Sequence, residues 1–106
     1  MINSKVYGLL GLTAKAGKIA FGTDSCLDMI EKQKLKLVIV AEDSSERTIN
    51  NFKQKCEQNS IDFYIFGKKD DISKSIGRVN KTVIGIKDKN LAGAIKKILN
   101  GGDVIG

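Results

Sequence analysis

The run Leu37–Val40 limits the fold of this chain more than any other stretch. Its four residues, Leu-Val-Ile-Val, are all apolar and do not alternate with polar residues. A run of this length is too short to cross a membrane, and the lack of alternation is typical of a strand that is buried on both faces. We therefore predict that Leu37–Val40 is a central strand, shielded by helices on both sides of its sheet.

Helical and strand patterns alternate along the rest of the chain, and no proline interrupts them. We expect strands at 18–21, 37–40, 61–66 and 82–86, a short helix at 70–76, and longer helices before, between and after them. Alternating helices and strands predict a three-layer α/β/α sandwich around a four-stranded mixed sheet. We expect one domain over residues 1–106, with its glycine-rich end, 100–106, frayed.

The junctions between strands and helices carry polar residues that suit the start of a helix. Thr23 and Asp24 are good capping residues for the second helix. Asp43 and Glu46 have the spacing of a capping box for the third helix, with Asp in place of the usual Ser or Thr. Asp88 is placed to cap the last helix.

The chain is basic, with a formal net charge of +6 and a pI near 9.4. A small basic domain concentrates polyanions around it, and nucleic acid is the commonest polyanion in a cell. The alternative is that this charge only confers solubility. Charge alone therefore favours, without proving, a nucleic-acid partner.

Cys26 and Cys56 both lie on apolar faces of helical patterns, thirty residues apart. This placement favours small, reduced core residues over a disulfide, and a reducing compartment. The chain has no histidine, no Cys-x-x-Cys and no signal-peptide pattern. We therefore expect a cytoplasmic protein without a zinc site or cofactor.

Gly22 lies at an expected junction between a strand and a helix, where a helix N-terminus attracts anions. Lys15 and Lys18 lie just upstream. If the sheet brings strand ends together, Arg78 and Lys81 border the same surface, so that the four cations cluster beside Gly22 and contact phosphates. From the residues alone, the alternative is equally open: Gly22 is only a turn residue, and the lysines form a solvated rim.

Few residues suit catalysis. The lack of histidine removes the commonest general base, and no Gly-x-x-x-x-Gly-Lys loop is present to hold phosphates. Asp43 at a strand end resembles a phospho-acceptor, with Lys87 as the late lysine of such a site, but no acidic pair follows the strand that ends at Phe21. We expect that the protein is not an enzyme.

Four longer segments carry a resemblance: Gly22–Asp28, Lys36–Asp43, Lys69–Gly77 and Thr82–Ile86. They resemble the kink-turn RNA-binding ribosomal protein family of L-seven-A-e and L-thirty-e type, and the resemblance covers nearly the whole chain. The stretch Leu10–Lys18 resembles the bacterial YlxQ-like branch in particular. This resemblance implies the family's α/β/α sandwich and a structured RNA as the partner.

In that family the second helix begins in the RNA major groove, and a Gly-x-Asn-Glu-x-x-Lys pattern reads the guanines of sheared G·A pairs. Gly22 matches the glycine of the pattern. Asp24 stands where the family has Asn or Lys, Ser25 where it has Glu or Gln, and Asp28 where it has Lys. Asp accepts hydrogen bonds but cannot donate them, and Asp28 brings a negative charge to a position that faces RNA.

The resemblance implies two further contact regions. The first lies near Ser45 and Ile49, although Ile49 also fits the buried face of its helix. The second places Arg78, Val79 and Asn80 against an extruded nucleotide, where Arg78 suits stacking on a base.

These observations lead to one hypothesis and one alternative. The hypothesis is a non-enzymatic RNA-binding protein of ribosomal type, monomeric and cytoplasmic, that recognises a structured, kink-turn-like RNA. The expected RNA-binding residues are Lys15, Lys18, Gly22, Thr23, Asp24, Ser25, Asp28, Arg78, Val79, Asn80 and Lys81. The alternative is a ribosome-associated protein-interaction module on the same fold, without direct sequence-specific RNA readout.

Overall fold

A computed structural model describes residues 2–101 of the chain, without the side chains of residues 2 and 3. Helices and strands alternate over this range. In chain order they are α1 (Ile2–Lys15), β1 (Ile19–Phe21), α2 (Thr23–Glu31), β2 (Leu37–Val40), α3 (Glu46–Gln58), β3 (Asp62–Ile65), α4 (Lys69–Ser75), β4 (Val83–Ile86) and α5 (Lys89–Leu99). In this part of the chain, no helix is both long and apolar enough to span a membrane. Most of the end expected to be frayed, residues 102–106, lies outside the described range.

The four strands form one mixed sheet in the order β1-β4-β2-β3. β4 pairs antiparallel with both β1 and β2, and β2 pairs parallel with β3. The residues Leu37 to Val40 are all buried, and their strand lies between β4 and β3. The prediction of a central strand is therefore confirmed, as is the four-stranded mixed sheet.

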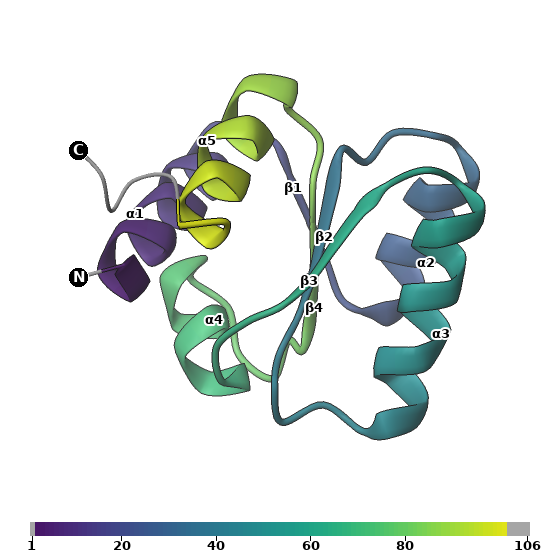
Figure 1. Ribbon diagram of the computed structural model, residues 1–106. Coiled ribbons are helices and arrows are strands. Elements are labelled where there is room, and N and C mark those ends of the chain that lie inside the picture. Colours follow the sequence, from purple (N-terminus) through teal and green to yellow (C-terminus); the bar gives the residue numbers. More distant parts are fainter. Residues whose placement is uncertain (1, 102–106) are drawn as a thin grey trace.

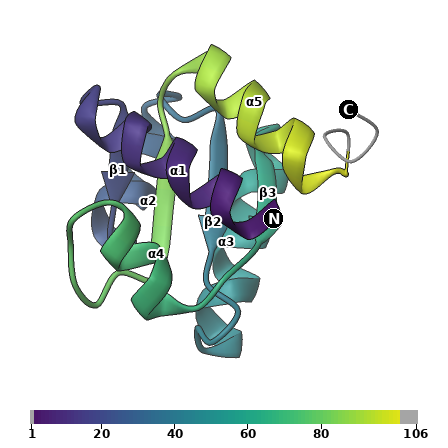
Figure 2. The same ribbon diagram turned by 90° about the vertical axis from the view of Figure 1, so that its left-hand side faces the viewer.

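Helices cover both faces of the sheet, as Figures 1 and 2 show: α1, α4 and α5 on one side, and α2 and α3 on the other. The side chains of β2 alternate between these layers. Leu37 and Ile39 pack in the core under α1, α4 and α5, whereas Val38 and Val40 pack with buried side chains of α2 and α3. The predicted three-layer sandwich is thus confirmed, and its two cores explain why a non-alternating apolar run is needed at its centre.

Two of the three predicted helix caps are wrong. Gly22, not Thr23 or Asp24, is the N-cap of α2 and provides no side-chain cap. Ser45, not Asp43, caps α3, because its hydroxyl oxygen accepts a hydrogen bond from the Thr48 N–H at 3.1 Å.

The cap predicted at Asp88 is confirmed, since its carboxylate accepts a hydrogen bond from the Leu91 N–H at 2.8 Å. Other element ends differ slightly from expectation. β1, β3 and β4 are one or two residues shorter than predicted, and α4 begins and ends one residue earlier. Gly77 follows α4 with a φ of 72°, a conformation that glycine adopts without strain.

Gly85 in β4 gives a test of how tightly the core is packed. A Cβ atom on Gly85 would lie 2.5 Å from Cδ1 of Leu35, a buried side chain. We expect Gly85→Ala to lower the free energy of unfolding by about 1–3 kcal/mol, because Leu35 must move within a filled core. Urea denaturation measures the change. Gly93→Ala is the control: Gly93 is exposed in α5 with no atom within 4 Å of the added Cβ, so it should raise stability by about 0.5–1 kcal/mol. Equal stability of the two variants would contradict this account of the core.

Candidate nucleic-acid interface

Gly22 joins the end of β1 to the start of α2. Its N–H donates to the Val83 carbonyl oxygen at 2.9 Å, which ties the junction to β4. Its φ of 92° is a conformation that side chains rarely adopt. Because Gly22 has no side chain to cap α2, the first-turn N–H groups remain available, and such groups attract anions.

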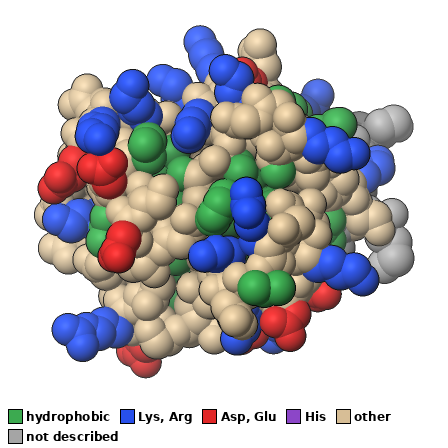
Figure 3. Space-filling model, turned by 180° about the vertical axis from the view of Figure 1, so that it is seen from behind, with side chains coloured by type: hydrophobic (Ala, Val, Ile, Leu, Met, Phe, Trp, Pro, Cys, Tyr) green, Lys and Arg blue, Asp and Glu red, His purple; other side chains and the backbone are tan. Residues whose placement is uncertain are grey.

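Two cations lie over the ring of Phe21, the residue before Gly22. The guanidinium carbon of Arg78 is 4.5 Å from the centre of the ring, and the Nζ atom of Lys81 is 5.4 Å from it. A Cβ atom on Gly22 would lie 4.0 Å from that Nζ atom. Cation–π attraction therefore holds both charges beside the start of α2. Figure 3 views the molecule from the side of β1 and shows Lys and Arg side chains around hydrophobic ones near its centre.

The loop between α4 and β4, which carries Arg78 and Lys81, is fastened to one buried residue, Ser73. The carbonyl oxygen of Ser73 accepts from the Arg78 N–H at 2.8 Å. Its hydroxyl accepts from the Lys81 N–H at 2.8 Å and donates to the Lys81 carbonyl oxygen at 3.1 Å. Asn80 lies in this loop with a φ of 56°. The loop therefore has a defined shape that aims its cations at Phe21.

A hollow of about 1060 Å³ lies along this loop. Its lining combines an aromatic ring, an exposed apolar side chain and three cations, and consists of Phe21, Asp70, Ser73, Lys74, Gly77, Arg78, Val79, Asn80 and Lys81. Val79 is a large apolar side chain in this lining, and it is 74% exposed. A planar ring with cations around it suits a nucleobase and its phosphate.

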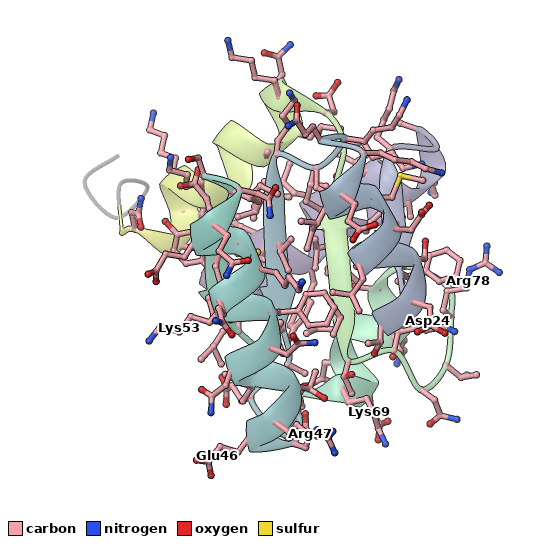
Figure 4. All side chains as sticks on the ribbon, turned by 90° about the vertical axis from the view of Figure 1, so that its right-hand side faces the viewer. Asp24, Glu46, Arg47, Lys53, Lys69 and Arg78 are labelled. Carbon is pink, nitrogen blue, oxygen red and sulfur yellow. The ribbon has the colours of Figure 1, made fainter. Side chains whose placement is uncertain are left out.

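The first turns of α2 carry the other expected residues, directly after Phe21 and Gly22. Thr23, Asp24 and Ser25 follow Gly22 directly and are exposed. Figure 4 shows Asp24 and Arg78 on the same side of the molecule. Asp28, one turn further along α2, is also exposed, and its carboxylate forms an ion pair with the Lys32 ammonium at 3.0 Å. Lys32 therefore offsets part of the negative charge of Asp28.

The expected cluster of four cations beside Gly22 is only half correct. Arg78 and Lys81 lie there, but Lys18 precedes β1, whereas Gly22 follows it. The Lys18 carbonyl oxygen accepts from the Lys87 N–H at 2.8 Å, at the other end of the strand. An extended chain rises about 3.3 Å per residue, so the backbones of Lys18 and Gly22 are about 13 Å apart. Lys15, at the end of α1, is next to Lys18 along the chain.

Sequence reasoning missed Phe21, Ser73 and Lys74 as parts of this surface. Phe21 was expected only as the last residue of a strand. A signal for Phe21 existed, because an aromatic residue directly before the Gly22 junction lies at the proposed anion site. Nothing local marked Ser73, whose role depends on a loop that folds back onto it.

The acidic pair after β2 has a structural role. The Asp43 carboxylate accepts from the Lys69 N–H at 2.8 Å, and the Glu42 carboxylate accepts from the Gly67 N–H at 3.1 Å. Both carboxylates thus tie the end of β2 to the segment that begins α4. Across residues 2–101, no group of three or more His, Cys, Asp or Glu side chains is arranged to hold a metal ion.

Fold and sequence together define the class of protein. The family model described as "Ribosomal protein L7Ae/L30e/S12e/Gadd45 family" matches residues 4–95, and the chain belongs to this family. Membership confirms the family resemblance that was inferred from the sequence. It also agrees with the prediction that the protein is not an enzyme, because the family is one of ribosomal proteins.

Individual relatives narrow the comparison to a bacterial branch. The chain is 32% identical over 97 residues to "RNA-binding protein YlxQ" of Enterococcus faecium, covering 92% of this chain and 93% of that protein. It is 27% identical over 94 residues to the protein of the same name from Bacillus subtilis, covering 89% and 94%. A solved structure of a protein of unknown function from Bacillus halodurans C matches with a TM-score of 0.88 and 25% identity, over 91% of this chain and 97% of that one. These similarities confirm the expected resemblance to the YlxQ-like branch.

Proposed function

We propose that this protein binds structured RNA through the start of α2 and the loop between α4 and β4. The observation that carries the proposal is the pair of cations, Arg78 and Lys81, held over the Phe21 ring beside the uncapped start of α2. Phosphates suit the cations and the free N–H groups, and a splayed base suits the ring. The relatives named as RNA-binding proteins support the same partner.

The finer proposal is that the RNA is a kink-turn or a close variant of one. In the binding mode of the family, Gly22, Thr23, Asp24 and Ser25 enter the major groove beside the sheared G·A pairs. The exposed positions of Thr23, Asp24 and Ser25 are compatible with that mode. Arg78, Val79 and Asn80 would then contact an extruded nucleotide in the hollow next to Phe21. Asp28 opposes this binding, because it brings a carboxylate close to phosphates.

Lys15 and Lys18 enter this proposal as outlying contacts. They lie toward the other end of β1, so they would meet a different part of the RNA from the part that Arg78 and Lys81 contact. Both side chains are exposed. Their contacts would be with phosphates, which position an RNA without reading its sequence. We further propose that the protein acts as a monomer in the cytoplasm.

Salt dependence tests the phosphate contacts. Each cation that contacts a phosphate adds roughly 0.7 to 0.9 to the slope of log affinity against log salt concentration. Lys81→Gln should therefore weaken binding to a kink-turn RNA and flatten that slope by nearly one unit. Lys53→Gln is the matched control, because Lys53 is exposed on the outer side of α3 (Figure 4). Lys18→Gln asks whether the RNA reaches the other end of β1.

Crosslinking in cells, followed by sequencing of bound RNA, separates this function from its alternative. Recovery of structured RNA supports the proposal. Recovery of no RNA above background, together with an equal salt slope for Lys81→Gln and Lys53→Gln, would favour the protein-interaction module instead.

A further inference from the structure

A stripe of polar side chains, one arginine and three amides, runs along one face of α3, next to the proposed RNA surface. Arg47, Asn50, Asn51 and Gln54 follow the spacing i, i+3, i+4, i+7, so they share a face of the helix. All four are exposed. Asn is a weak helix former, so Asn50 and Asn51 add little to the stability of α3. Their exposed position leaves these side chains accessible to a partner.

This stripe borders a groove between α3 and the start of α2. The groove has a volume of about 500 Å³ and is lined by Thr23, Arg47, Thr48, Asn50, Asn51, Phe52 and Gln54. Figure 4 shows Arg47 on the side of α3 that faces α2, with Glu46 and Lys53 on the other side. Because Thr23 is the first residue of α2, the groove is continuous with the surface at Gly22.

The amides of the groove have hydrogen-bonding groups to spare. Within the described part of the chain, no side-chain hydrogen bond joins Asn50, Asn51 or Gln54 to another residue, and no carboxylate lines the groove. Two amides outside the groove have partners: Asn59 donates to the Lys55 carbonyl oxygen, and Asn100 accepts from the Tyr64 hydroxyl. The groove thus offers donors and acceptors together, with one positive charge and no negative one.

This chemistry differs from that of α2 itself. Asp24 and Asp28 on α2 can only accept hydrogen bonds, whereas each amide of α3 both donates and accepts. A base edge presents donors and acceptors side by side, and Asn or Gln matches the N6 and N7 atoms of adenine with two hydrogen bonds. Arg47 in the same groove suits the phosphate of such a nucleotide.

We propose that the α3 groove binds unpaired nucleotides next to the RNA segment that contacts α2, and that Asn51 and Gln54 select adenine there. This inference rests on the proposed function, since it needs an RNA held at the start of α2. It assigns base selection to α3, which offers the paired donors and acceptors that the carboxylates of α2 lack.

The test uses a kink-turn RNA that carries three randomised, unpaired nucleotides beside its G·A pairs. The RNAs retained by the protein are sequenced, and binding to a plain duplex of equal length is measured in parallel. The wild-type protein should enrich adenine about tenfold at one or more randomised positions, the discrimination expected of one two-bond contact. At least one of the variants Asn51→Ala and Gln54→Ala should abolish most of this enrichment. Gln58→Ala is the matched control, being an exposed glutamine one turn beyond Gln54 that does not line the groove, and it should keep the enrichment.

The outcomes separate this inference from the proposed function. Wild-type protein that binds the kink-turn RNA without base preference at the randomised positions would overturn the inference and leave the proposed function standing. A preference that survives in both Asn51→Ala and Gln54→Ala would also overturn it. If the wild-type protein binds neither RNA, the proposed function and the inference fail together. Since Asn51 and Gln54 are exposed, both variants should fold, and circular dichroism verifies this.

Discussion

Asp28→Lys should bind a standard kink-turn RNA at least about tenfold more tightly than the wild-type protein at a fixed salt concentration. In the proposed binding mode, the substitution removes a carboxylate that faces phosphates and adds an ammonium in its place, a change of about 1–3 kcal/mol if the contact resembles a good base contact. It also frees Lys32, which Asp28 holds in an ion pair at 3.0 Å. Asp28→Ala should give a smaller gain, because it removes a repulsion without adding an attraction.

Two controls show whether this gain is specific. Glu31→Lys makes the same change of charge at another exposed position of α2, and it should tighten binding much less. An RNA whose sheared G·A pairs are replaced by Watson–Crick pairs should gain less from Asp28→Lys than the kink-turn does. Equal gains on both RNAs would mean that Asp28 affects only general attraction. No gain on either would show that this face of α2 does not meet RNA.

Alkaline pH should destabilise the protein far more than it destabilises the double variant Cys26→Ala/Cys56→Ala. Burial, with a smaller contribution from Cys56, raises the pKa of the Cys26 thiol from 9.0 to about 12. Burial likewise raises the pKa of Cys56 from 9.0 to about 11. Above pH 9 the unfolded chain therefore releases two protons that the folded protein retains, so stability falls as the pH rises.

Each thiol contributes about 1.4 kcal/mol per pH unit in this range. Between pH 9 and pH 11 the wild-type protein should lose about 3–5 kcal/mol more than the double variant, a large part of the stability of an ordinary domain. Urea denaturation under reducing conditions at several pH values measures both slopes. Comparing slopes cancels the packing that alanine loses at all pH values. Parallel slopes would show that the buried thiols do not govern alkaline unfolding.

The sequence predicted the fold closely because its strands are marked by local patterns. The run Leu37–Val40 lies between two cores, which bury both faces of this apolar strand. The helix starts were predicted less well. Ser45 and Asp43 are both suitable caps by residue type. The Asp43 carboxylate instead accepts a hydrogen bond from the Lys69 N–H, so Ser45 is left to cap the helix. The spacing of residues in the sequence does not predict that contact.

The residues of the candidate site were likewise predicted well only where a local pattern marked them. Gly22 was identified because a glycine at a strand-to-helix junction is a local signal. Phe21 was missed because the cations above it come from a loop more than fifty residues later. Lys18 was misplaced for the opposite reason: it is close to Gly22 in sequence, but an extended strand separates the two.

The hydrogen bonds of Ser73 have a consequence for the entropic cost and the selectivity of ligand binding. One buried side chain and its carbonyl hold both ends of the segment from Arg78 to Lys81. The conformational entropy of that segment is therefore lost when the chain folds, and little remains to be lost on association. A ligand that fits this fixed conformation binds without the entropic cost of ordering the loop. A ligand of another shape cannot bind by changing the conformation of the loop. Ser73 therefore gives this surface a fixed conformation that selects ligands by their shape.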